Sequence, residues 1–243
     1  MRLDIFLVEN ELASSRTEAK GFIQSGAVTV GGKCILKPSF VIEDDSLNVS
    51  VDRSIKKYAS RGGFKLAGAL TEFKIDVNGK SAIDIGASSG GFTDCLLQNG
   101  ATHVISVDSG SGQLADFLRK DDRVTVIENY NARYMKPEDL EYRPQIAVMD
   151  VSFISATYII EAIAAVLADG GEFVCLVKPQ FEVGRQGLGK GGIVKDDKIR
   201  RSALNKVVDF ATQHGFDFIS AITSPIKGGD GNTEYLAYFK KRI

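Results

Sequence analysis

Residues 81–94, with the sequence SAIDIGASSGGFTD, constrain the fold more than any other segment of this chain. Apolar residues end in Asp84, a turn of small residues with three glycines follows, and a helix start is indicated at Phe92. This order predicts a buried strand, a tight turn and a helix N-terminus, the geometry that lets a backbone approach a nucleotide-like ligand. Glycines favour such an approach because they have no Cβ atom.

The chain after residue 66 alternates between strand and helix patterns, which predicts an α/β fold with a mostly parallel, Rossmann-like sheet. Strands are predicted at 81–85, 103–107, 124–127, 145–149, 172–177, 216–222 and 234–239. Helices are predicted at 63–73, 91–99, 111–119, 155–167 and 196–213.

Residues 1–52 predict a separate small α+β unit. Leu3 and Leu7 have helical spacing, and Ser15 with Glu18 fits a capping box at the start of a second helix. Residues 27–36 predict a hairpin around a glycine turn. Further short strands are predicted at 41–42 and 47–51.

Composition limits the possible settings of the protein. The 243 residues are 44% hydrophobic and 25% charged, with a formal net charge of −1, as in globular proteins that are not basic overall. Three scattered cysteines and two distant histidines predict neither a disulfide framework nor a metal site, which favours a reducing, cytoplasmic setting. We expect no signal peptide and no membrane span, because acidic residues interrupt the apolar runs.

The glycine turn has the spacing Asp84-x-Gly86-x-x-x-Gly90-Gly91. It lacks the G-x-G-x-x-G pattern that places a dinucleotide pyrophosphate on a helix N-terminus, so a dehydrogenase is disfavoured. It resembles the first motif of class I S-adenosylmethionine methyltransferases, and this resemblance implies S-adenosylmethionine as the cofactor.

Asp108 ends the second predicted strand, where a carboxylate can accept both ribose hydroxyls of the cofactor; a helix cap is the alternative role. Asn129 and Asn131 follow the third strand, where the resemblance implies contacts to adenine. The cofactor-binding residues expected on this basis are Asp84, Gly86, Ala87, Ser88, Gly90, Gly91, Phe92, Asp108, Asn129 and Asn131.

Four charged residues, Lys65, Asp150, Lys178 and Glu234, are the candidate catalytic group. Asp150 and Lys178 each end an apolar strand, and an antiparallel last strand would bring Glu234 to the same sheet edge. Solvated strand ends are the alternative for any one of them. The set resembles the Lys-Asp-Lys-Glu tetrad of FtsJ-type ribose 2′-O-methyltransferases. With Lys178 as the candidate base, Asp150 and Glu234 would orient the lysines and hold the hydroxyl, and the protonation state of the lysines stays open.

The segment LASSRTEAKGFIQSGAVTVGGK, residues 12–33, resembles the core of the S4 RNA-binding domain. Residues 53–65 then form a basic linker, either a solvated connector or a segment that follows an RNA backbone. Lysine and arginine contacts to phosphate would give salt-sensitive affinity. The expected RNA-binding residues are Arg2, Arg16, Lys20, Lys33, Lys56, Lys57 and Arg61.

With the motifs YASRGGFKL, MDVSFIS and LVKPQFEVG, nearly the whole chain resembles the TlyA family, also known by a hemolysin-like name. The resemblance implies an S4-like domain at 1–58 and an FtsJ-like domain at 59–243 whose last strand is antiparallel. It implies a ribose 2′-O-methyltransferase that uses S-adenosylmethionine, without a metal, on ribosomal RNA or a ribosomal subunit. A membrane-active hemolysin and a catalytically silent ribosome assembly factor remain alternatives, and the oligomeric state stays open.

Overall fold

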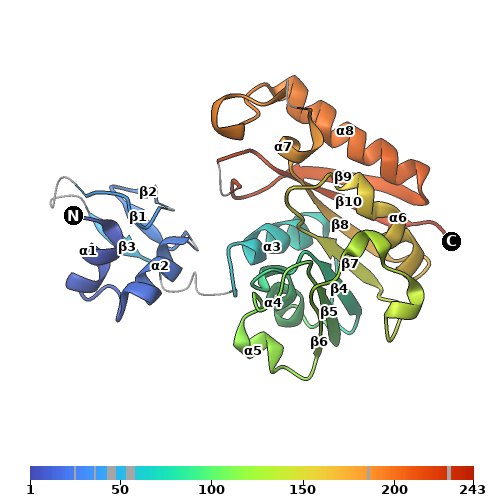
Figure 1. Cartoon of the computed structure of the whole chain (residues 1–243), viewed down its shortest axis with the longest axis horizontal. Coiled ribbons are helices and arrows are strands. Elements are labelled where there is room, and N and C mark those ends of the chain that lie inside the picture. The colour runs from blue at the N-terminus through green and yellow to red at the C-terminus, as the bar shows by residue number, and fades with distance from the viewer. Residues whose placement is uncertain (25, 36, 43–47, 53–57, 185–186, 229–230) are drawn as a thin grey trace. The chain divides into compact units, whose positions relative to one another are not determined.

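The computed structural model describes residues 1–243 except 25, 36, 43–47, 53–57, 185–186 and 229–230. Two units follow one another along the chain, Met1–Arg61 and Gly62–Ile243 (Figure 1). The predicted boundary lies between residues 58 and 59.

The first unit contains two helices, α1 (Leu3–Glu9) and α2 (Arg16–Gln24), and a small antiparallel sheet. The sheet order is β2 (Lys33–Cys34), β1 (Val28–Val30) and β3 (Val49–Val51). The predicted hairpin is therefore present, whereas the strand predicted at 41–42 makes an isolated bridge from Val41 to Arg2. An apolar core that includes Leu3, Leu7 and Ile23 holds the unit together.

Within the described residues of the second unit, seven strands form one sheet in the order β6-β5-β4-β7-β8-β10-β9. The first five strands are parallel, and β10 runs antiparallel to both of its neighbours, as predicted. Buried apolar side chains fill the central strands. The strands are β4 (Ser81–Ile85), β5 (His103–Val107), β6 (Val124–Ile127), β7 (Ile146–Met149), β8 (Glu172–Val177), β9 (Phe216–Thr223) and β10 (Tyr235–Lys241).

The chain runs from β4 outward through β5 to β6 and then returns to β7 on the other side of β4. Ligands of open α/β sheets bind beyond the carboxyl ends of the strands at such a change of direction. Helices cover the two faces, with α3 packed on α4 and α6 packed on α8 (Figure 1). The helices are α3 (Gly62–Phe73), α4 (Gly91–Gln98), α5 (Asp116–Arg119), α6 (Thr157–Val166), α7 (Pro179–Glu182) and α8 (Asp197–Gln213), with 3-10 turns η2 (Ala132–Tyr134), η3 (Pro137–Asp139) and η5 (Lys190–Gly192).

The helix predicted at 111–119 is wrong in its first half, because only Asp116–Arg119 is helical. The Asp108 carboxylate accepts a hydrogen bond from the Gly110 backbone at 2.7 Å, which stabilises a turn instead. Gly112 then adopts a φ of +67°, which a right-handed helix does not allow.

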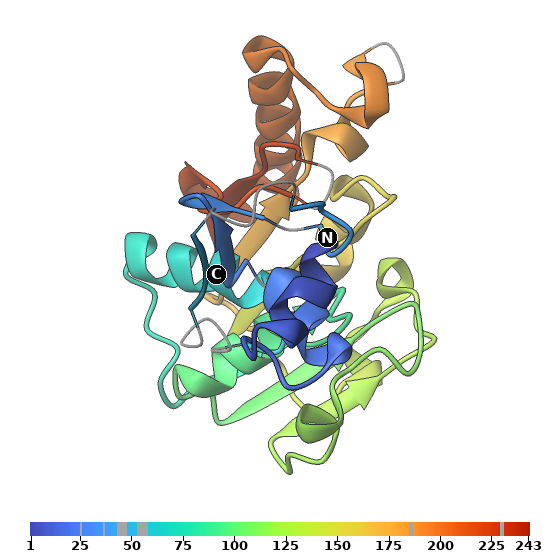
Figure 2. The ribbon, with the colours of Figure 1, turned by 90° about the vertical axis from the view of Figure 1, so that its left-hand side faces the viewer.

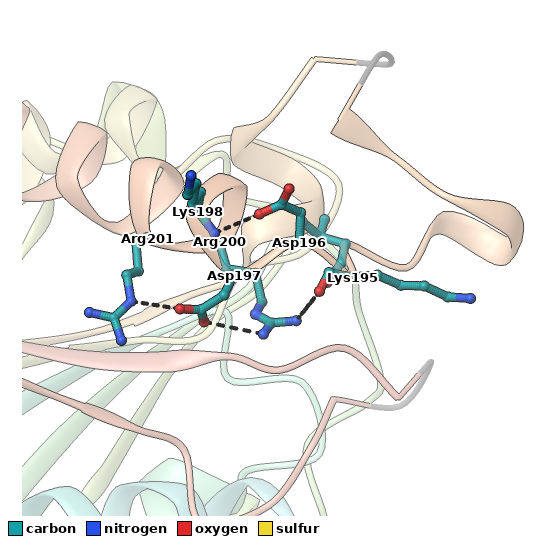
Figure 3. A network of polar contacts seen from close by, with 7 residues as sticks. Lys195, Asp196, Asp197, Lys198, Arg200 and Arg201 are labelled. Atoms are coloured by element: carbon teal, nitrogen blue, oxygen red, sulfur yellow. Dashed lines mark hydrogen bonds and ion pairs between the residues drawn. The ribbon is translucent and has the colours of Figure 1, made fainter.

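The start of α8, the long orange helix in Figure 2, is fixed by a network of charged residues (Figure 3). Asp196 caps the helix by accepting a hydrogen bond from the Lys198 backbone at 2.7 Å. Arg200 donates to the Lys195 carbonyl at 2.9 Å, and Asp197 pairs with Arg200 and Arg201. Among the described residues, no helix is both long and apolar enough to cross a membrane.

Candidate active site

A cavity of about 470 Å³ lies at the carboxyl ends of the parallel strands. The turns that follow β4, β5, β6 and β7 form its walls. Its polar lining includes Ser88, Asp108, Asn131, Asp150 and Ser152. This is the place where the sheet topology predicts a ligand.

Gly86 lies where two of these turns meet. Its φ is +82°, and a Cβ atom there would lie 2.5 Å from the backbone oxygen of Asp150 and 3.0 Å from its carbonyl carbon. The turn after β4 and the segment after β7 therefore touch through their backbones. A side chain at this position would push them apart.

Asp84 is completely buried and does not line the cavity. Its Oδ2 accepts hydrogen bonds from the Thr93 backbone at 2.8 Å and from the Thr93 hydroxyl at 2.7 Å. The carboxylate thereby ties the end of β4 to the first turn of α4. Burial raises the pKa of Asp84 to about 7, although the two Thr93 bonds act in the opposite direction.

We expect Asp84→Asn to remove a pH dependence of stability. The folded-state pKa of about 7 lies above the ordinary value of 3.8, so ionisation of Asp84 opposes folding. The contribution of protonated Asp84 to the free energy of unfolding is fully present below about pH 4 and is lost as the pH rises through about 7. The free energy of unfolding of the wild type should therefore fall relative to Asp84→Asn by about 1.4 kcal/mol per pH unit in that window.

Calorimetry of both proteins without cofactor, at a series of pH values from about 4 to about 8, measures this difference. A difference that stays constant with pH would contradict the raised pKa.

Asp108 borders the cavity with both oxygens held by backbone groups. Ser88 donates its N–H to Oδ2 at 2.7 Å, and Gly110 donates to Oδ1 at 2.7 Å. The carboxylate is therefore fixed in direction and retains lone pairs for a ligand diol. No helix begins at this residue in the described structure, which leaves the alternative role as a helix cap without support.

The other predicted cofactor residues divide into two groups. Asn131 borders the cavity and caps η2 by accepting a hydrogen bond from the Arg133 backbone at 3.1 Å. Asn129 does not border it and has a left-handed φ of +55°. Ala87, Gly90, Gly91 and Phe92 also lie outside the cavity lining, within the turn and the first residues of α4.

The four candidate catalytic residues meet in a chain of alternating charges. Lys178 Nζ lies 2.6 Å from Asp150 Oδ1, and Lys65 Nζ lies 3.9 Å from Asp150 Oδ2 and 2.7 Å from Glu234 Oε2. Glu234 is 2% exposed and Lys65 is 8% exposed, so this pair is nearly dry. Asp150 also lines the cavity and places the charged chain at its wall.

Two residues of the MDVSFIS motif that were not among the predicted site residues also lie at this site. Ser152 accepts a hydrogen bond from Lys178 Nζ at 2.6 Å. Phe153 lines the cavity, is 91% exposed and has a left-handed φ of +66°, which is rare for a bulky residue. A large aromatic residue three positions after a candidate catalytic carboxylate, at the end of a strand, is the sequence signal that points to this position.

In the first unit, Arg2 and Arg16 are brought together by Asp4, whose side chain is fully buried. Asp4 Oδ1 lies 2.9 Å from Arg2 Nε, and Oδ2 lies 3.1 Å from Arg16 Nη2. The hydrogen bonds from Arg2 lower the pKa of Asp4 to about 2 in spite of its burial, and Arg16 adds to this effect. Asp4 thus fixes both guanidinium groups while each stays about half exposed.

The remaining predicted RNA-binding residues are spread more widely. Lys20 and Lys33 are exposed, and Arg61 is partly buried. Lys56 and Lys57 lie outside the described residues. Among the residues that are described, no group of three or more His, Cys, Asp or Glu side chains is arranged to hold a metal ion.

Comparisons with known proteins give consistent matches. The FtsJ-like methyltransferase model matches residues 58–241, and the S4 domain model matches residues 1–46. The 16S/23S rRNA (cytidine-2′-O)-methyltransferase TlyA of Mycobacterium tuberculosis is 40% identical over 98% of this chain and 89% of its own length. Hemolysin A of Brachyspira hyodysenteriae is 43% identical over 98% of this chain and 99% of its own length.

Solved structures agree with these matches. A Streptococcus thermophilus protein that carries a provisional hemolysin name is 44% identical, with a TM-score of 0.78 over 100% of this chain and 88% of that one. An S-adenosylmethionine-dependent methyltransferase from Mesorhizobium loti has a TM-score of 0.55 at 14% identity over 74% of this chain and 99% of that one, a similarity of fold alone.

Proposed function

The chain belongs to the TlyA family of FtsJ-like methyltransferases, and we propose that it methylates ribose 2′-hydroxyl groups of ribosomal RNA with S-adenosylmethionine as the donor. The observation that carries the proposal is the continuous chain of Lys178, Asp150, Lys65 and Glu234 at the cavity wall. Two further observations support RNA as the acceptor: the match to the S4 domain and the paired guanidinium groups of Arg2 and Arg16.

The residues around the cavity suit the proposed cofactor. Asp108 is oriented to accept hydroxyl groups of a ribose, and the Cβ-free Gly86 lets the turn after β4 and the segment after β7 meet at the cavity wall. Ser88 and Asn131 add polar groups to the same walls. S-adenosylmethionine, when bound, supplies a methyl group on a positively charged sulfur, an electrophile that needs no further activation.

Asp108→Ala is expected to weaken binding of S-adenosylmethionine about 10- to 100-fold, because hydrogen bonds to a charged group contribute about 1.5–3 kcal/mol. Isothermal titration calorimetry measures the affinity, and the exposed Asp122→Ala is the matched control. Equal affinities for wild type and Asp108→Ala, in a folded variant, would contradict the role assigned to Asp108.

In the proposed reaction, the neutral amine form of Lys178 accepts the proton of the ribose hydroxyl through its lone pair and becomes an ammonium ion paired with Asp150. That hydroxyl is a weak nucleophile, so its proton must leave as its oxygen attacks. Asp150 and Ser152 occupy two directions around Lys178 Nζ, which leaves one direction for the hydroxyl. Lys65 and Glu234 hold the other oxygen of Asp150 in place, and correct positioning accounts for much of the rate.

Phe153 supports an unstacked nucleotide as the acceptor. An aromatic ring that is 91% exposed beside a catalytic group offers a surface on which a base can stack. A base held outside its helix would present its ribose to Lys178. The relative from Mycobacterium tuberculosis is named for cytidine, and we extend that base to this chain as part of the proposal.

The test is transfer of labelled methyl groups from S-adenosylmethionine to purified ribosomal subunits that lack 2′-O-methylation. We expect incorporation at a ribose 2′-oxygen, located by resistance of the neighbouring phosphodiester to alkaline hydrolysis. Cofactor binding without transfer to any ribosomal subunit or free ribosomal RNA would contradict the proposal and favour a silent assembly factor.

A further inference from the structure

Glu182, the last residue of α7, has a buried carboxylate outside the catalytic tetrad. Its side chain is 2% exposed. In the described part of the chain it accepts hydrogen bonds from the Ser155 hydroxyl at 2.5 Å, the Ala156 backbone at 2.7 Å and Lys206 Nζ at 3.1 Å. A carboxylate is costly to bury unless it is paired and hydrogen-bonded, as this one is.

The partners of Glu182 connect it to the catalytic segment. Ser155 and Ala156 end the stretch 150–156, which begins with Asp150 and carries Ser152 and Phe153. At the other end, Lys178 immediately precedes α7. One helical turn therefore joins the proposed base to the far end of the segment that holds its carboxylate partner.

A second contact also joins α7 to segment 150–156. The ring of Phe181, next to Glu182 in α7, lies 5.2 Å from the ring of Phe153 at an angle of 49°. Phe153 has a φ of +66°, a conformation that persists only where the surrounding structure holds it. Phe181 contacts its ring, and Glu182 anchors the backbone that follows it.

Packing alone does not require a charged residue at position 182. Well-packed apolar residues often replace a buried ion pair without loss of stability, so burial of a carboxylate is weak evidence for a stabilising role alone. The two segment donors, by contrast, have specific directions that a carboxylate can satisfy together.

We propose that Glu182 is a positioning residue for methyl transfer, which holds segment 150–156 so that Phe153 and Asp150 keep their places relative to Lys178. This inference rests on the proposed function. It assigns to Glu182 an effect chiefly on how the RNA acceptor is presented, because Ser155, Ala156 and Lys206 do not themselves line the cavity.

The test compares Glu182→Ala and Glu182→Gln with wild type in steady-state methyl transfer to ribosomal subunits. Glu182→Ala should lower kcat/KM for the RNA acceptor about 10- to 100-fold, since small displacements at a reacting centre have effects of this size. Its affinity for S-adenosylmethionine should stay within about twofold of wild type. Glu182→Gln should recover much of the loss because its amide oxygen still accepts from the Ala156 backbone.

Lys206→Met is the matched control. It removes the cation paired with Glu182, which lies outside segment 150–156, and leaves the two segment bonds intact. The free energy of unfolding should therefore fall, while transfer by the folded variant stays within about threefold of wild type. If Glu182→Ala does not fold, Ser155→Ala removes one segment bond and takes its place in the comparison.

A double-mutant cycle with Phe153→Ala separates positioning from a general structural effect. If Glu182 acts through Phe153, adding Glu182→Ala to Phe153→Ala should cause little further loss. Three outcomes would overturn the inference while the proposed function stands. In the first, the losses of activity of Glu182→Ala and Phe153→Ala multiply in the double variant. In the second, Glu182→Ala loses RNA affinity and cofactor affinity equally, and in the third, folded Glu182→Ala and Ser155→Ala are fully active beside an active wild type. An inactive wild type would overturn both.

Discussion

Lys178→Ala is expected to lower the rate of methyl transfer about 10²- to 10⁴-fold, the range in which general bases contribute. Lys178 contacts Asp150 at 2.6 Å and Ser152 at 2.6 Å, so its Nζ has a fixed direction at the cavity wall. Alanine removes the proposed base and leaves the turns after β4, β5 and β6 unchanged. The affinity for S-adenosylmethionine should therefore change far less than the rate.

Single-turnover transfer to ribosomal subunits measures the chemical step, and calorimetry measures cofactor affinity. Lys178→Arg should be nearly as inactive as Lys178→Ala, because arginine keeps the positive charge and does not release its proton in proteins. Lys120→Ala, at an exposed lysine that ends α5, is the matched control. Wild-type rates in folded Lys178→Ala would remove the proposed base from the mechanism.

Gly86→Ala is expected both to destabilise the protein and to abolish transfer. The residue would have to adopt a φ of +82°, and its Cβ atom would lie 2.5 Å from the backbone oxygen of Asp150, which cannot swing aside as a flexible side chain can. Left-handed strain and overpacking together predict a loss of about 2–5 kcal/mol in the free energy of unfolding. Transfer fails because the relief of the clash displaces Asp150.

Gly170→Ala is the matched control for this prediction. Gly170 has a φ of +71° in the turn before β8, and a Cβ atom there would meet nothing within 4 Å. It should lose only the strain contribution of about 1–2 kcal/mol and keep its activity. Denaturant unfolding and the transfer assay together distinguish the two variants, and equal effects of both would show that the contact with Asp150 is unimportant.

The seven strands predicted in the second unit agree closely with the structure because each is rich in apolar residues and is bounded by turn residues. Such runs become buried strands wherever the sheet forms, so a local pattern is enough to locate them. The helix predicted at 111–119 failed for the opposite reason. Leu114, Phe117 and Leu118 have helical spacing, but the hydrogen bond from Gly110 to Asp108 and the positive φ of Gly112 set the local structure.

Residue type and position at the strand ends are enough to indicate Asp108, Asp150 and Lys178, because parallel strands present their carboxyl ends at one edge. The partners of these residues are harder to find from local patterns. Ser152, Phe153 and Glu182 act through contacts that depend on how the segment after β7 folds back toward α7. Asp84 was expected among the cofactor ligands, and its burial against Thr93 follows from the packing of α4 on β4.

The sequence by itself determined the class of fold, the glycine turn and the charged residues at the sheet edge, because these depend on local periodicity and on side-chain chemistry. Only the tertiary structure decided which charges touch. Because β7 lies beside β8, Asp150 meets Lys178, and because α3 packs on β10, Lys65 reaches both Asp150 and Glu234. Residues 65, 150, 178 and 234 are far apart along the chain. Their contacts are set by strand order and by the burial that excludes water from the pair formed by Lys65 and Glu234, and neither is encoded in any local segment.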